Sequence, residues 1–174
     1  VRDLVVTCGT NQSSSCFFVQ QADRACGIRA DKPLLVTIDI GEVIDISGTL
    51  TTAGGERGLT SVSFNRVSAD TAPGALALGA SSVGGSPLDS FNPGVTGGVG
   101  PFNVGLLARV WGRITHVDGP NKVFYIDDGT GLEDGTAEDR KGIRVSWGQM
   151  SGLPPQPAVG VYAAVTGMVS CFQS

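Results

Sequence analysis

A run of mostly apolar residues carries three side chains that are well suited to binding. In the segment LLARVWGRIT, residues 106–115, a two-residue period places Arg109, Trp111 and Arg113 on one face of a predicted strand. Indole rings stack on bases or sugars and guanidinium groups bind phosphates, so this face is a candidate ligand site, with Tyr125 as a fourth member. The alternative is structural, with the arginines covering Trp111 and stabilising the sheet or an interface.

A second candidate site is the acidic segment DDGTGLEDGTAED at residues 127–139. Calcium prefers carboxylate and carbonyl oxygens, and the candidate ligands are Asp127, Asp128, Glu133 and Asp134. Their spacing differs from that of an EF-hand loop. Asp–Gly pairs are also typical of solvated turns, which need no metal. We therefore expect a turn here and keep calcium as the weaker alternative.

Residues that could perform catalysis do not form a recognised pattern. His116, the only histidine, lies near the end of a predicted strand, and no GxSxG segment precedes a helix. No well-marked pair of carboxylates indicates sugar hydrolysis. The four cysteines form no CxxC pair, which disfavours a zinc site. We predict that the chain is not an enzyme and needs no cofactor.

The cysteines fit a disulfide framework better than a metal site. Cys8 and Cys16 flank a short loop containing TNQSSS, which leaves Cys26 and Cys171 for a second bridge. Four cysteines allow three pairings, and Cys171 could instead link to another molecule. Four free thiols are the remaining alternative. The even cysteine count and a first residue other than Met predict an extracellular or cell-surface protein whose N-terminal signal has been removed.

The overall composition limits the choice of partner. The net charge is −4 and the pI is near 4.8, whereas binding to a phosphate backbone is driven by a surplus of Lys and Arg. This balance disfavours nucleic acid and leaves carbohydrate as the better candidate. No run of about 18 apolar residues occurs, so no membrane-spanning segment is predicted. Only 16% of the residues are charged, and neutral surface of this kind often forms an interface.

Strand patterns and turn residues alternate along the chain, and no window shows helical periodicity, which predicts an all-β protein. Several blocks also occur twice in the same order. FFVQQ (17–21) matches FYIDD (124–128), GIRA (27–30) matches GIRV (142–145), and GEVIDISGTL (41–50) matches GVYAAVTGMV (160–169). This repeat predicts two small Greek-key barrels, in which Gly48 and Gly167 would permit a bend or a bulge.

The second copy of the repeat resembles a known family. The segments LLARVWGRITHVDGPNKVFYIDDGTGL (106–132), KGIRV (141–145) and AVGVYAAVTGMVS (158–170) resemble the OB-fold domain of bacterial secreted and cell-surface proteins. The first copy resembles it more loosely, and the pair resembles tandem OB-fold surface proteins. The resemblance implies two OB-fold barrels, at residues 1–67 and 105–174, joined by a Gly/Ala-rich connector of low charge at 68–104.

The two copies differ at the position of the last strand. An OB barrel has five strands, and residues 59–67 supply a fifth strand in the first copy. The second copy ends five residues after Val169, which leaves no room for an ordinary fifth strand. An unpaired edge is costly or adhesive, so we expect the connector or a strand of another molecule to cover it.

This open edge suggests a function. Copies that complete one another head to tail would form a surface filament or nanotube, so the chain is predicted to be an extracellular, self-assembling structural subunit whose partners are other copies of itself. The alternative is an OB-fold module that binds oligosaccharide or, less favourably, single-stranded nucleic acid, as an accessory domain of a secreted enzyme for example.

Overall fold

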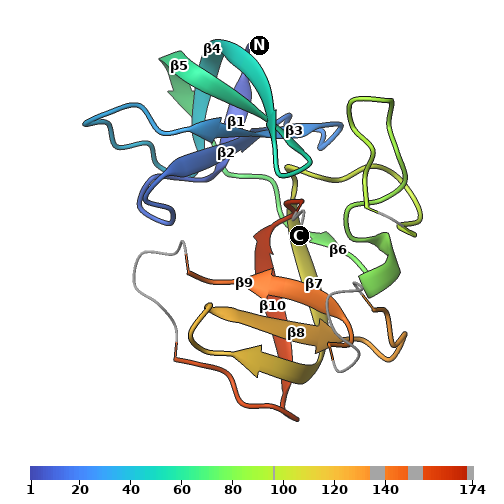
Figure 1. The fold of residues 1–174 in the computed structure, drawn as a ribbon. Helices are drawn as coiled ribbons and strands as arrows, with labels where there is room; N and C mark the ends of the chain where they lie inside the picture. The colour runs from blue at the N-terminus through green and yellow to red at the C-terminus, as the bar shows by residue number, and fades with distance from the viewer. Residues whose placement is uncertain (96, 134–139, 149–154, 172–174) are drawn as a thin grey trace.

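The computed structural model describes residues 1–95, 97–133, 140–148 and 155–171. These residues form β-strands and one short 3-10 turn at Ala80–Ser82, so the predicted all-β class is confirmed. The strands are arranged as a closed barrel and a separate sheet (Figure 1). No helix in the described ranges has the length and apolar character needed to cross a bilayer.

The first half of the chain forms the closed barrel. Its strands are β1 (Leu4–Cys8), β2 (Cys16–Gln20), β3 (Gly27–Asp31), β4 (Glu42–Ala53) and β5 (Glu56–Ala69). They close in the order β1-β2-β3-β5-β4, with β3 parallel to β5 and the other pairs antiparallel. Alternating apolar residues of these strands fill the interior, among them Leu4, Val6, Phe17, Val19, Ile44, Ile46 and Leu59.

Two glycine-dependent features shape the β4–β5 hairpin. Gly54 and Gly55 have φ of 59° and 80° and connect Ala53 to its register partner Glu56, as a two-residue turn of this handedness requires. Further along, the register shifts between Ser47 and Thr49, which is the bulge predicted at Gly48. A side chain at Gly48 would lie 2.8 Å from the Thr60 carbonyl oxygen, so the bulge needs glycine.

The second half forms an open sheet. Its strands are β6 (Leu76–Ala77), β7 (Leu107–Asp118), β8 (Val123–Asp127), β9 (Ile143–Ser146) and β10 (Tyr162–Met168). The main order is β10-β7-β8-β9, all antiparallel, and β6 adds a short parallel pair to the start of β7. Its core consists of Ile114, Phe124, Ile126 and Trp147.

The strands of the sheet pair with one another in the same order as those of the barrel, except at the place of the fifth strand. β1 pairs with β2 and β4, and β7 likewise pairs with β8 and β10. In the barrel, β5 lies between β3 and β4, whereas the described residues contain no strand between β9 and β10. The part of the connector that forms a strand does not cover this edge, because β6 pairs with Ala108 and Arg109 of β7.

The two halves meet through close backbone contacts. Gly27 at the start of β3 packs on Gly105, which precedes β7, so closely that a Cβ on Gly105 would lie 2.4 Å from the Gly27 carbonyl oxygen. The buried Gln20 accepts a hydrogen bond from the Leu107 N–H at 3.1 Å. Since barrel and sheet share these contacts, the orientation of one half constrains that of the other.

The predicted disulfides are not formed. Cys8, Cys16, Cys26 and Cys171 are all free thiols. A register shift between Val6 and Cys8 places Cys8 opposite Phe18, so it is not the cross-strand partner of Cys16. The thiols of Cys8, Cys16 and Cys26 contact oxygen atoms instead, as in the 3.3 Å hydrogen bond from Cys26 Sγ to Gln21 Oε1.

Candidate functional site

The open side of the second sheet exposes part of its core. The side chains of Val110, Ile143, Val145, Ala163 and Val165 pack on this core but stay only half-buried. In the barrel β5 closes the wall, and most of the matching positions, among them Ala30, Ile44 and Ile46, are buried, whereas Ile28 stays half-buried. An apolar surface beside two strand edges is therefore accessible in this half of the molecule.

The two edges that border this surface are β9 and β10. β10 pairs with β7 in an unbroken register from Tyr162–Arg113 to Met168–Leu107, and β9 pairs only with β8 in the described part of the chain. The outward backbone N–H and C=O groups of both strands can thus accept an added strand. The gap matches the place that β5 fills between β3 and β4.

A second exposed apolar feature is the tip of the loop between β3 and β4. Leu34 is 91% exposed and Leu35 is 104% exposed, and the loop projects from the barrel (Figure 1). Leu35 also has a φ of 58°, a conformation that glycine adopts freely and that is costly for a branched side chain. No contact within the described molecule compensates for this arrangement, which was not predicted from the sequence.

The predicted stripe on β7 is formed as expected. Arg109, Trp111 and Arg113 are exposed on one face, and Trp111 is 53% exposed. Tyr125 is not accessible beside these residues, since it is 1% exposed. Its ring instead contacts His116 edge-on at 6.0 Å between centroids, because β8 has both of its faces covered. The exposed tyrosine near the stripe is Tyr162 of β10, the register partner of Arg113.

Comparison of the chain with known protein families, curated proteins and solved structures finds no match.

The acidic segment forms a turn in its described part. Asp127 Oδ1 accepts the Gly131 N–H, and Asp128 accepts the backbone N–H of Ala80 through Oδ2 and the Thr130 hydroxyl through Oδ1. These hydrogen bonds lower the pKa of Asp128, although burial opposes them. Glu133 lies 3.9 Å from the Lys141 ammonium. Asp134 lies outside the described residues. The described acids are thus engaged in turn and ion-pair contacts.

The described residues contain no group of three or more His, Cys, Asp or Glu side chains that could hold a metal ion. His116 lies in β7 opposite Tyr125, is half-buried and packs edge-on against the Tyr125 ring.

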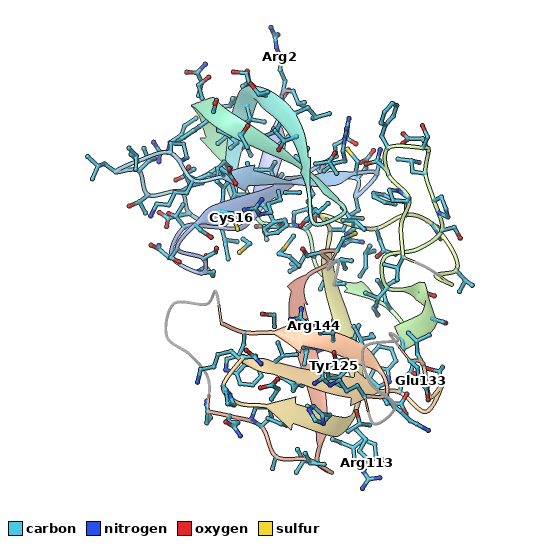
Figure 2. All side chains as sticks on the ribbon, in the orientation of Figure 1. Arg2, Cys16, Arg113, Tyr125, Glu133 and Arg144 are labelled. Atoms are coloured by element: carbon cyan, nitrogen blue, oxygen red, sulfur yellow. The ribbon has the colours of Figure 1, made fainter. Side chains whose placement is uncertain are left out.

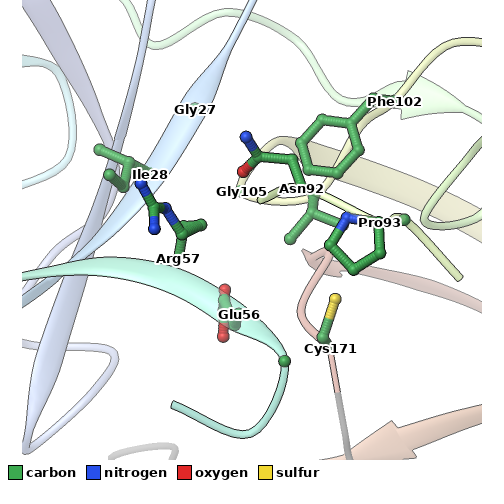
Figure 3. Close-up of a pocket in the computed structure, with 12 residues that line it drawn as sticks. Gly27, Ile28, Glu56, Arg57, Asn92, Pro93, Phe102, Gly105 and Cys171 are labelled. Atoms are coloured by element: carbon green, nitrogen blue, oxygen red, sulfur yellow. The ribbon is translucent and has the colours of Figure 1, made fainter. Parts of the chain in front are cut away.

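The junction between the halves encloses a small cavity of about 70 Å³ (Figure 3). Glu56, Asn92 and Cys171 supply polar groups to its wall. Glu56 is only 9% exposed, and its Oε1 is buried without a hydrogen-bond partner in the described residues. Burial raises the pKa of Glu56, while the Ser170 hydroxyl and the charge of Arg29 act in the opposite direction. No sequence pattern marks this carboxylate, because its partners are distant along the chain.

Proposed function

We propose that the chain is an extracellular structural subunit that assembles head to tail into a bacterial surface filament or tube. In this proposal both halves are OB-fold domains, and a strand from a neighbouring copy completes the second one. The observation that supports it is the gap between β9 and β10, at the place that β5 fills between β3 and β4. The half-buried side chains beside the gap would be covered in the assembled state.

Strand addition would remove two energetic costs at once. The added strand would pair with the backbone groups at the edges of β9 and β10, and its side chains would bury Val110, Val145 and Val165. Full burial of an exposed valine contributes about 1.5–3 kcal/mol, and these half-buried side chains would gain roughly half of that. An association of this kind needs no catalytic group, which agrees with the interpretation of the chain as a structural protein.

The loop tip at Leu34 and Leu35 is a candidate for a second contact surface, separate from the gap between β9 and β10. Two fully exposed leucines, one of them in a costly backbone conformation, are expected to be covered in the functional state. Because this tip belongs to the barrel and the gap belongs to the second sheet, the two surfaces would face different neighbours. Contacts between unlike surfaces form rings or open helical polymers rather than closed dimers.

The extracellular location is part of the same proposal and rests on the resemblance of the sequence to secreted and cell-surface domains. The four free thiols give it no support. Cys16 is buried and Cys8 is half-buried, whereas Cys26 is exposed and would be open to oxidation outside the cell.

The proposal is tested by electron microscopy and size exclusion of the purified protein over a range of concentrations. We expect polymers, and we expect Val165→Lys to abolish them by placing a charge beside the gap. Val99→Lys, at an exposed valine of the connector, is the matched control and should assemble normally. Wild-type protein that stays monomeric at every concentration would contradict the proposal, as would equal assembly of Val165→Lys with an intact fold by circular dichroism.

A further inference from the structure

The outer face of β7 and β10 presents a compact group of exposed aromatic and cationic side chains. Arg109, Trp111 and Arg113 alternate along β7, and Tyr162 lies across from Arg113 on β10. Two arginines four residues apart on a strand are separated by about 13 Å, with the indole between them. Tyr162 is 82% exposed, so the group offers two accessible aromatic rings.

The neighbours of Trp111 leave its ring uncovered. Its register partner on β10 is Ala164, and that of Arg109 is Thr166, so only small side chains of β10 lie opposite these two residues. In the described molecule no cation–π contact involves Trp111, although three other arginines stack on aromatic rings. The structural explanation of this stripe requires the arginines to cover the indole of Trp111. They do not cover it in the described molecule.

The positive charge of this face is only partly balanced, because Asp127 of β8 is a register partner of Arg113 but accepts the Gly131 N–H. Neither Arg109 nor Arg113 forms a salt bridge with a described carboxylate. Arg113 Nε donates a 3.4 Å hydrogen bond to the Gly160 carbonyl, which helps to hold its guanidinium beside Tyr162. Because the chain as a whole carries a net charge of −4, the face is a local site for an anionic ligand rather than part of a basic surface.

We propose that this face binds an acidic polysaccharide. Sugar rings would stack on Trp111 and Tyr162, and carboxylate or sulfate groups would pair with the guanidinium groups of Arg109 and Arg113, whose planar donors match such anions in bidentate geometry. Single-stranded nucleic acid fits less well, because two arginines on an acidic protein release few counterions. The site lies on the outer face of the sheet, separate from the gap between β9 and β10, so it does not depend on assembly.

The experiment measures binding of the purified protein to polygalacturonate, with neutral dextran and single-stranded DNA as competing classes. We expect retention by polygalacturonate alone, weakening as salt is raised. Trp111→Ala and Arg113→Gln should each lower the affinity about tenfold, the effect of losing one stacking or bidentate contact. Arg2→Gln is the matched control, since Arg2 lies at the opposite end of the molecule from Arg113 (Figure 2).

Circular dichroism and thermal melting of each variant separate loss of the site from loss of the fold, and Arg109→Gln serves as a second test if Trp111→Ala does not fold. Equal binding of dextran and polygalacturonate would overturn the proposed role of the arginines. Preference for DNA would assign the face to nucleic acid instead. Absence of binding to all three polymers, or wild-type affinity in folded Trp111→Ala, would overturn the proposal.

Discussion

Ser170 Oγ donates a 2.6 Å hydrogen bond to Glu56 Oε2, so the segment that follows β10 is bonded to the β4–β5 hairpin of the barrel. The two residues are 114 positions apart in sequence. This contact lies beside the cavity at the junction and involves a carboxylate whose other oxygen is buried without a partner among the described residues. The junction between the halves is therefore sensitive to the protonation of one side chain.

The first prediction concerns pH. Burial raises the pKa of Glu56 in the folded protein above the ordinary value of 4.5, so folding favours the protonated form. The contribution of protonated Glu56 to the free energy of unfolding is complete below pH 4.5. It is lost as the pH rises through the raised pKa of the folded protein. We expect Glu56→Gln to be more stable than the wild type at pH 7, with the difference vanishing near pH 4.

Urea denaturation at several pH values measures this effect, and Ser170→Ala provides a comparison. Loss of the hydroxyl should cost about 1 kcal/mol and leave a pH dependence, because the carboxylate stays buried. A wild-type protein that exceeds Glu56→Gln in stability at pH 7 would show that the Arg29 charge outweighs burial.

The second prediction concerns the glycine contact at the junction. Gly105 has a φ of 86° and packs against the Gly27 backbone, so Gly105→Ala adds both a costly conformation and a clash. Gly100 has a φ of 84° and no atom near its missing side chain, so Gly100→Ala adds the conformational cost alone. We expect about 1 kcal/mol for Gly100→Ala and at least about 2 kcal/mol for Gly105→Ala by chemical denaturation. Equal losses would mean that the two halves do not pack as closely as described.

The third prediction concerns the loop tip. Replacing Leu34 by Ser and Leu35 by Gly removes the exposed apolar surface and places glycine where the φ is positive. Stability should stay within about 1 kcal/mol of the wild type, since neither side chain is covered in the isolated molecule. The critical concentration for assembly, measured by sedimentation, should rise. Leu88→Ser, at another exposed leucine, should leave the critical concentration unchanged. If Leu88→Ser raises it as much as the loop-tip replacement does, the loop tip is not part of the proposed contact.

The fourth prediction concerns the thiols. Burial, with a smaller effect of Cys16, raises the pKa of Cys8 to about 11, so little thiolate forms near neutral pH. Iodoacetamide at pH 8 should modify the exposed Cys26 well before Cys8. Mass spectrometry without a reducing agent should show four free thiols. A mass lower by two hydrogen atoms would show that one disulfide has formed, in agreement with the sequence-based expectation and against the free thiols of the structure.

The sequence predicts local geometry well where one short pattern decides it. The two-residue period of β7 placed Arg109 and Trp111 together on an exposed face, and the bulge at Gly48 follows from a glycine in a strand. Gly167, its counterpart in the repeat, lies in a regular register with open space around it. The same residue type thus has different roles, because only Gly48 faces a neighbouring carbonyl.

Features that depend on distant partners could not be predicted. The two-residue period of β8 predicts an exposed side chain at Tyr125. The Arg140 guanidinium, however, lies 5.9 Å from the centre of its ring and covers it. The Cys8 register depends on a bulge that its own sequence does not mark. Glu56 lies next to a Gly–Gly turn, where a solvated carboxylate is the ordinary expectation, yet it is 9% exposed and bonded to Ser170, which is distant along the chain.

Hydrogen exchange of the β9 and β10 amides at low and high protein concentration tests the central claim most directly. If a neighbouring copy adds a strand in the gap, amides of Ile143–Ser146 and Tyr162–Met168 exchange more slowly in the concentrated sample, while those of β1 and β2 do not change. If the β9 and β10 amides exchange at the same rate at every concentration, no strand is added there and the account is wrong.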